Sequence, residues 1–424
     1  MAVNNLFGVD TNEEALKVAC FSIYIALLDY QEPKDIDIYQ FPDLLDKNLF
    51  IANFFNTEHY FDKKIRKEKV NFILGNPPWK SKKDDKIHIK WLKDNEITVG
   101  RYEIAQSFLL RVKDFMQPCA KTALIVTSTM FYNTSATTKK FKNKFLTTYC
   151  LEKLFDLSAV KQTLFETQES PASILFFRIS QNEEYNKNII KHCCIKVNYF
   201  LKKFKILVIE KFDQKEILQR YFIENEWLFK VALYGNSLDY NLIKNTKIKN
   251  NQKLIKLIDD KMLFVTSGVL RGNRKNKFSK LQGLSLIENE NIKQYYTFEM
   301  NNKVTKSDLF LEAGRSINNF NKSKILIKEQ AKDWTDLIIS YNPQSSVFIK
   351  GVFGLSFSNK NHLKLLYSIL ISDFYKYFIF LISGGWGIAT HPQTKWVEEY
   401  LSFPFDVDKP AEVWFGNYLL GVIN

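Results

Sequence analysis

The fold is decided by nine consecutive residues, Asn71-Phe72-Ile73-Leu74-Gly75-Asn76-Pro77-Pro78-Trp79. Their apolar part, residues 72–74, is short and is followed by residues that break regular structure, a pattern that predicts a buried strand. The two prolines have no backbone N–H and a restricted φ, so the chain cannot continue as a paired strand. We therefore expect a stiff turn at the carboxyl end of this strand, where open α/β sheets place their ligands.

The side chains of this turn suit a flat aromatic amine. An Asn side chain offers one acceptor and two donors, so the Asn76 carbonyl and the neighbouring prolyl carbonyl can accept both hydrogens of an exocyclic amine. Trp79 offers a flat face for a planar ring. The alternative is a rigid surface turn whose aromatic residue binds no ligand. Four residues alone do not decide between the two interpretations.

Composition points to a globular chain with a basic surplus. The 424 residues give room for two or three domains, and a hydrophobic content of 46% is enough for packed cores. The formal charge is +14, from 60 Lys and Arg against 46 Asp and Glu. Such a surplus favours a polyanionic partner, because phosphate contacts supply most non-specific affinity. A general enrichment in lysine gives the same balance, so charge alone decides little.

Cysteine and histidine spacing predicts neither a metal site nor a disulfide framework. No Cys-x-x-Cys pair occurs among the five cysteines. No signal peptide is recognisable at the start. The apolar segment 365–382 contains Asp373 and Lys376, which are costly at the centre of a bilayer, so we expect a buried amphipathic helix rather than a membrane span. We expect a cytoplasmic protein.

Strands alternate with helices up to about residue 180, which predicts a mostly parallel sheet with crossover helices. The strand over 6–10 ends in Asp10, beside the start of a helix that Thr11 or Asn12 can cap, a usual place for an acid that binds two ribose hydroxyls. Further elements are expected as strands over 50–54, 122–126, 151–157 and 171–178 and as helices over 105–116 and 139–145.

From residue 181 the character of the chain changes. Residues 181–187 are polar and acidic and are predicted to be a linker. The segment 266–278 combines two glycines with four cations, and Arg or Lys there can reach phosphates or guanine edges. Lysines also crowd the stretch after Trp79, Lys82 and Lys83 among them, where they are placed either to meet phosphates or simply to face solvent. A long helix is expected over 360–382.

Taken together, these pieces resemble the N6-adenine DNA methyltransferases of restriction–modification systems, of a type II or IIG-like kind. Members carry Asn-Pro-Pro-Tyr, -Phe or -Trp after an apolar strand, and the resemblance is strongest over residues 6–178. It implies a Rossmann-like S-adenosylmethionine-dependent methyltransferase sheet over 1–180, N-terminally incomplete. It also implies an α+β DNA target-recognition domain with C-terminal helices over 181–424.

The resemblance assigns roles residue by residue. The catalytic motif matches Asn76, Pro77, Pro78 and Trp79, and the target base is expected to stack on Trp79 and Phe165. The S-adenosylmethionine contacts match Asp10, Asn53 (where many members have Asp) and Phe108. The DNA contacts are expected at Arg271, Arg274, Lys275, Lys277, Lys82 and Lys83.

One departure bears on activity. The family has a glycine-rich cofactor loop after its first, central strand, and here only residues 1–5 precede the Asp10 strand. We therefore expect either a separate chain that supplies this part or a truncated remnant. The expected partners are double-stranded DNA and either such a chain or a restriction subunit.

Two further functions remain as alternatives to an active enzyme on DNA. One is a non-catalytic, DNA-binding subunit, which the missing glycine loop favours. The other is a methyltransferase acting on RNA or on protein glutamine, which shares the motif, although the basic glycine segment in a long C-terminal region speaks against it. No nuclease cluster is recognisable.

Overall fold

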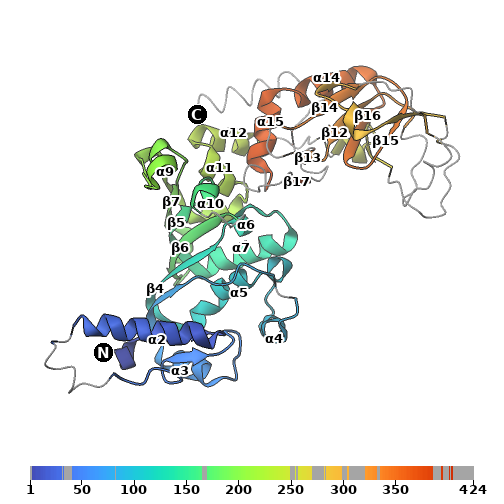
Figure 1. Ribbon diagram of the computed structural model, residues 1–424. Helices are drawn as coiled ribbons and strands as arrows, with labels where there is room; N and C mark the ends of the chain where they lie inside the picture. The colour runs from blue at the N-terminus through green and yellow to red at the C-terminus, as the bar shows by residue number, and fades with distance from the viewer. Residues whose placement is uncertain are drawn as a thin grey trace. The chain divides into compact units, whose positions relative to one another are not determined.

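The computed structural model describes residues 2–30, 32, 41–81, 83–164, 170–248, 254, 256–269, 281, 283–297, 303–304, 320–331, 335–384, 393–394, 401 and 403. The chain forms two compact units (Figure 1). Unit 1 comprises Met1–Glu166 and Pro171–Glu224, and unit 2 comprises Thr167–Ser170 and Asn225–Asn424.

Unit 1 begins with α1 (Ala2–Asn5) and a small parallel sheet made of β1 (Gly8–Asp10) and β2 (Leu49–Ile51). The two strands are joined through α2 (Glu13–Leu28), whose start at Asn12 was predicted. The Asn12 side chain accepts hydrogen bonds from the second and third backbone N–H groups of the helix, as an N-cap does.

The larger sheet of unit 1 has six strands. Two neighbouring pairs are parallel and three are antiparallel. The expectation of a mostly parallel sheet was therefore wrong for this part, because β6 lies between β4 and β5 and runs against both. The strands in spatial order are β3 (Val70–Gly75), β4 (Met116–Thr127), β6 (Ala172–Ile179), β5 (Tyr149–Asp156), β7 (Ile189–Cys194) and β8 (Gln214–Leu218).

Unit 1 extends beyond the boundary expected near residue 180. β7 pairs with β5, and β8 pairs with β7, so both belong to the same sheet. The polar stretch 181–187 holds the short helix η4 (Glu184–Asn186) between two strands of that sheet. The Gln219 side chain, at the start of α10 (Gln219–Glu224), donates to the backbone carbonyls of Leu146 and Tyr149 and so fastens the end of the unit to β5.

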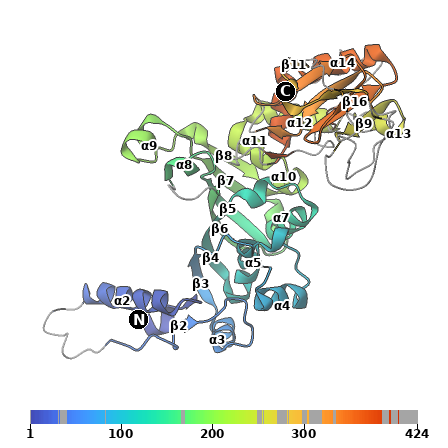
Figure 2. The same cartoon turned by 45° about the vertical axis from the view of Figure 1, so that its right-hand side comes forward.

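Helices connect and flank these strands (Figure 2). The helix expected over 105–116 is present as α5 followed by η3, and the one expected over 139–145 lies within α7. The remaining helices of unit 1 are α3 (Tyr60–Glu68), α4 (Lys86–Asp94), η2 (Gly100–Tyr102), α5 (Ile104–Arg111), η3 (Val112–Phe115), α6 (Thr129–Tyr132), α7 (Ala136–Thr148), α8 (Lys161–Leu164), α9 (Tyr199–Phe204) and η5 (Lys211–Asp213).

Unit 2 contains a five-stranded sheet in the order β11-β14-β12-β16-β9, in which only the β11–β14 pair is parallel. β10 and β15 form a parallel pair, and β13 and β17 an antiparallel one. The strands are β9 (Leu263–Ser267), β10 (Ser285–Ile287), β11 (Tyr295–Tyr296), β12 (Lys324–Lys328), β13 (Gln330–Ala331), β14 (Ile339–Asn342), β15 (Ser346–Phe348), β16 (Val352–Phe357) and β17 (Gln393–Thr394).

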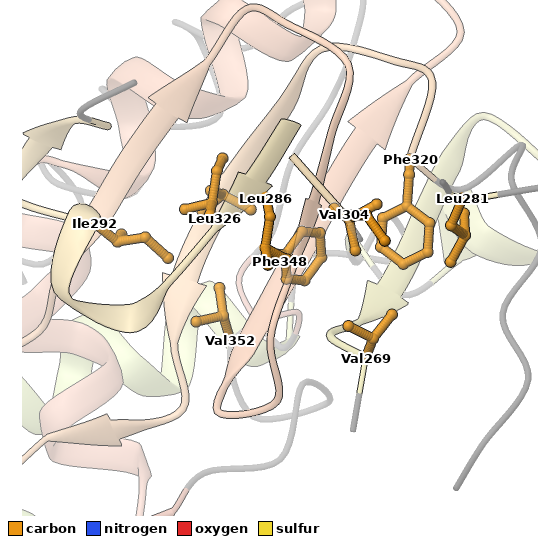
Figure 3. Packing of buried hydrophobic residues seen from close by; sticks show 11 residues of the cluster. Val269, Leu281, Leu286, Ile292, Val304, Phe320, Leu326, Phe348 and Val352 are labelled. Carbon is orange, nitrogen blue, oxygen red and sulfur yellow. The ribbon is translucent and has the colours of Figure 1, made fainter. Parts of the chain in front are cut away.

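The core of unit 2 is a cluster of buried aliphatic and aromatic side chains (Figure 3). Phe348 of β15 meets Phe320 edge to face, with ring centroids 5.5 Å apart. Leu326 of β12 and Val352 of β16 belong to the same cluster, so the small strand pair and the larger sheet share one core.

The helix expected over 360–382 is in fact two helices, α14 (Lys360–Leu370) and α15 (Asp373–Ile382). They meet at a bend of 70°. Ser372 lies in the break and caps α15 by accepting a hydrogen bond from the backbone N–H of Tyr375. No single described helix is long and apolar enough to cross a membrane, although this bent pair passes on length and composition. The other helices of unit 2 are α11 (Leu228–Tyr234), α12 (Ser237–Ile248), α13 (Lys256–Asp259) and η7 (Asn289–Asn291).

Candidate active site

The predicted turn lies at the carboxyl end of β3, which ends at Gly75. Asn76 and Pro78 are exposed and Pro77 is buried. The Asn76 side chain makes no hydrogen bond to another described residue, so its carbonyl and amide are available to a ligand. A β-carbon at Gly75 would lie 3.1 Å from a methyl group of Leu124 in β4, so glycine allows the tight contact that seats the turn.

Trp79 is held by the sheet on which it lies. Its indole N–H donates to the carbonyl of Ile125 in β4 at 3.3 Å. The half-buried ring packs against a cluster that includes Val160, Ile195 and Leu201. One edge of the indole is therefore fixed, so ordering this ring around a ligand carries little further entropic cost.

Glu103 packs against the segment that follows Trp79, and sequence reasoning missed it. Ser81 and Glu103 form an antiparallel bridge. Gln106 donates to the Glu103 carboxyl at 2.6 Å. Burial raises the pKa of Glu103 to about 7. No motif could have marked this acid, because its low exposure comes from the fold.

Asp10 is the last residue of β1 and lies opposite Ile51 in the parallel register, and Asn53 comes shortly after the end of β2. One Asp10 oxygen accepts from the backbone N–H of Asn12 at 2.8 Å, and the other has no described partner. Asn53 donates from its amide to Asp85 at 3.1 Å. The two residues therefore lie at the same edge of the small sheet.

Asp85 is a second residue that sequence reasoning missed. It caps α4 by accepting from the backbone N–H groups of Ile87 at 3.1 Å and His88 at 3.0 Å, besides binding Asn53. A cap before an apolar-periodic stretch is the signal that could have found it.

Phe108 stacks on Phe54 with ring centroids 4.2 Å apart and planes 8° from parallel. Phe54 in turn lies under the guanidinium of the fully buried Arg111, at 5.2 Å from carbon Cζ to the ring centroid. Arg111 is paired with the buried Asp62. One face of Phe108 is thus occupied by the protein's own ring, so a ligand has access only to its remaining surface.

Two of the three apolar residues at 72–74 are exposed rather than buried, which corrects the prediction. Phe72 is 73% and Leu74 81% exposed. β3 pairs only with β4, and β1 only with β2, among the described strands. Val9 of β1 and Ile73 of β3 nevertheless pack against the same buried cluster, which includes Phe61. Strands β1 and β3 therefore each have one unpaired edge and share one apolar cluster.

Helix α2 adds exposed apolar surface to this part of unit 1. Val18, Phe21, Ile25 and Leu28 are 65, 64, 47 and 37% exposed. Their spacing of three and four residues places them on one face of the helix. The opposite face, with Leu16 and Cys20, is packed against β2.

Most of the predicted DNA contacts lie outside the described residues. These are Phe165, Lys82, Arg271, Arg274, Lys275 and Lys277. Lys83 is described and exposed, between the turn and α4. Gly268 has a role within the chain, because a β-carbon there would lie 2.1 Å from the carbonyl oxygen of Ile349.

Comparison with known proteins supports the resemblance over part of the chain. Residues 4–165 match the family model described as Eco57I restriction-modification methylase. No curated protein matches the sequence. The matched segment contains the turn at Asn76 together with Asp10, Asn53 and Phe108.

Several solved structures are similar in fold. MmeI, a Type IIL restriction-modification enzyme solved in complex with DNA, is 11% identical over 84% of this chain and 49% of its own, with a TM-score of 0.47. A nuclease-deletion mutant of the Type ISP enzyme LlaGI, with a DNA substrate mimic, is 12% identical over 84% and 37%, with a TM-score of 0.43. A type I methyltransferase subunit from Streptococcus thermophilus is 13% identical over 46% and 38%, with a TM-score of 0.29.

The chain spans less than half the length of each of these three structures. Over residues 4–165 the sequence is similar to the Eco57I restriction-modification methylases.

Proposed function

We propose that the chain is a site-specific DNA methyltransferase that transfers a methyl group from S-adenosylmethionine to adenine N6, within a restriction–modification or related defence system. The observation that carries this proposal is the turn after β3. Its exposed Asn76 amide has no described hydrogen-bond partner, and the indole beside it is held on β4. A flat aromatic amine fits this pair of groups. An adenine of duplex DNA presents such an amine when it leaves the base stack.

Base flipping supplies the substrate in this proposal. Extruding the base costs a few kcal/mol, and stacking on an aromatic side chain returns about 1–3 kcal/mol. Trp79 and Phe165 take the two faces of the ring. Asn76 and the Pro77 carbonyl accept the amine hydrogens and draw electron density toward N6. Fixing the amine in line with the methyl donor supplies much of the rate enhancement.

The residues at the ends of β1 and β2 fit the adenosine part of S-adenosylmethionine. The second Asp10 oxygen is available for the ribose hydroxyls, and the Asn53–Asp85 pair lies at the same edge for the adenine. Phe108 offers its remaining surface to that ring. When bound, the cofactor supplies the electrophilic methyl group. Nothing among the described residues takes the place of the family's glycine-rich loop at the methionine end.

A second candidate function is a DNA-binding chain whose cofactor half comes from elsewhere. The unpaired edges of β1 and β3 and the exposed Phe72 and Leu74 favour it, because an unpaired edge is a template for another strand. A strand–turn–helix segment placed there completes the sheet and brings a glycine-rich loop to the site. Under either function, residues 268–278 are the proposed reader of duplex DNA.

Asn76→Ala tests the proposal against a matched control, Asn71→Ala, which removes another exposed amide, in the strand that precedes the turn. Methyl transfer is measured with a tritiated cofactor and DNA affinity by gel shift, with the strand–turn–helix segment supplied. We expect Asn76→Ala to lower methyl transfer on the order of 100-fold or more, as loss of one polarising group does, with DNA affinity nearly unchanged.

Equal turnover of the two variants would remove Asn76 from the mechanism. A wild-type chain that binds DNA and transfers no methyl group, even with the segment supplied, would instead favour the second candidate function.

A further inference from the structure

Residues 196–212, which connect β7 to β8, form an unusual surface that we call the α9 surface. Only Leu201 of helix α9 is buried. Around it, eight large apolar side chains are each at least 40% exposed, which are Val197, Tyr199, Phe200, Phe204, Ile206, Leu207, Ile209 and Phe212. Exposed apolar groups gathered in this way mark interaction sites in soluble proteins.

The α9 surface is also basic. It carries five lysines against one acid, Glu210, and the lysines are Lys196, Lys202, Lys203, Lys205 and Lys211. Among the described residues none of the five is paired with a carboxylate. The Lys203 ammonium lies 5.5 Å from the ring centroid of Tyr199 and 5.3 Å from that of Phe204. Cations and rings therefore share one exposed surface.

Two contacts place this surface beside the candidate active site. Leu201 belongs to the buried cluster against which Trp79 packs. Lys205 donates from its ammonium to the carbonyl of Thr163 in α8 at 3.2 Å. Helix α9 is thus fixed to the same cluster as the indole of the turn, and Figure 1 shows it near β7. A strand that delivers a base to Trp79 passes close to α9.

We infer that the α9 surface binds the nucleic acid next to the target base, with lysines on phosphates and aromatic rings on bases or sugars. The inference rests on the proposed function. Lysines interleaved with aromatic side chains are typical of surfaces that follow a nucleic-acid backbone and stack on its bases. The centres of protein–protein interfaces are depleted of lysine, so a protein partner fits this composition less well.

The test compares two double variants of the full chain. Lys202→Ala with Lys203→Ala changes the α9 surface, and Lys63→Ala with Lys67→Ala changes exposed lysines of α3 in the same unit. Binding to a 30-base-pair duplex and to single-stranded DNA is measured by fluorescence anisotropy over a series of salt concentrations. We expect the α9 variant to reduce the salt slope by about 2, at roughly one unit per phosphate contact, and the α3 variant to leave it unchanged.

A third variant, Phe200→Ala with Phe204→Ala, is expected to weaken binding with an unchanged slope, because the rings carry no charge. A melting temperature equal to that of the wild type shows that the exposed substitutions left the fold intact. Wild-type binding with the same slope and affinity in the α9 variants would overturn the inference alone. A wild-type chain without DNA affinity would overturn the proposed function as well, and self-association lost in the aromatic variant would then assign the surface to a protein partner.

Discussion

Strands β3 and β16 are both short apolar runs, yet one is exposed and the other is buried along its whole length. β16 lies between β12 and β9, and all six of its residues are buried. β3 has a neighbour on one side only, and Phe72 and Leu74 face solvent. An apolar sequence predicts that a segment is buried, but the elements packed beside it decide whether burial occurs. For β3 the described strands supply no neighbour on its second side.

Helix α2 extends this contrast from a strand to a surface. Its stripe of exposed apolar residues at helical spacing resembles the buried stripe of α14, in which Leu363, Leu366 and Leu370 are covered. Unit 1 thus has an unpaired strand edge and an uncovered apolar helix stripe. We expect a segment that contains one strand and one helix to cover both. Among the described strands of unit 2, the edge strand β11 also exposes two large side chains, Tyr295 and Tyr296.

The largest expected effect comes from truncating equivalent side chains in the two strands. Leu355 in β16 is fully buried, so Leu355→Ala should destabilise unit 2 by about 2–5 kcal/mol through lost burial and a residual cavity. Phe72→Ala should change the stability of unit 1 by no more than about 0.5 kcal/mol, as for other exposed positions. Urea unfolding of the full chain, followed by limited proteolysis of each unit, measures both.

A loss of similar size for Phe72→Ala would mean that β3 is covered in solution by part of the chain itself. The contrast between the two strands would then not hold in solution, and the docking of an added element on this edge would have no basis.

An added strand–turn–helix segment should produce the next largest effect. A glycine-rich peptide with an apolar strand and one apolar helix face is expected to raise the melting temperature of unit 1 and to confer micromolar binding of S-adenosylmethionine, because partners stabilise the state they bind. Calorimetry on the 424-residue chain with and without the peptide measures both. Leu74→Lys should leave the melting temperature of the chain alone nearly unchanged and abolish the gain.

Micromolar cofactor binding by the chain without any addition would contradict this account. It would show that other residues take over the role of the glycine-rich loop, and that the unpaired edges of β1 and β3 serve some other contact.

The sequence predicted those parts of the molecule that depend on local chemistry. The cap at Asn12, the turn from Asn76 to Trp79 and the strand that precedes it follow from residue types and spacing. What failed depends on distant neighbours. Leu74 looked buried because apolar runs usually find cover, and the sheet looked parallel because nothing local shows that β6 enters between β4 and β5.

The site residues missed by sequence reasoning were missed for the same reason. Glu103 owes its raised pKa to burial beside Ser81 and Gln106, and neither neighbour marks it as special along the chain. Asp85 gains importance from Asn53, which lies 32 residues away in sequence. Both contacts arise only when the strands bring separate loops to one edge.

The smallest expected effect concerns buried charge, which again separates the two units. Burial raises the pKa of Glu103 in unit 1 from 4.5 to about 7, and it lowers the pKa of Lys324 in unit 2 from 10.5 to about 8. An acid whose folded pKa is raised loses stability as pH rises from its unfolded to its folded value. Unit 1 should therefore lose stability between pH 4.5 and about 7. A base with a lowered folded pKa behaves in the opposite sense, so unit 2 should gain stability between about pH 8 and 10.5.

Glu103→Gln keeps the hydrogen bond that the side chain accepts from Gln106 and removes the titration. The melting temperature of unit 1 should then stay level between pH 4.5 and 7, and above pH 7 it should exceed that of the wild type by a few degrees. The control Glu68→Gln, at an exposed end of α3, should leave the wild-type profile unchanged. Scanning calorimetry across both pH windows measures the profiles. If Glu103→Gln and wild type decline in parallel, then Glu103 is ionised in the folded protein, and the segment after Trp79 is more open to water than its packing against this carboxyl implies.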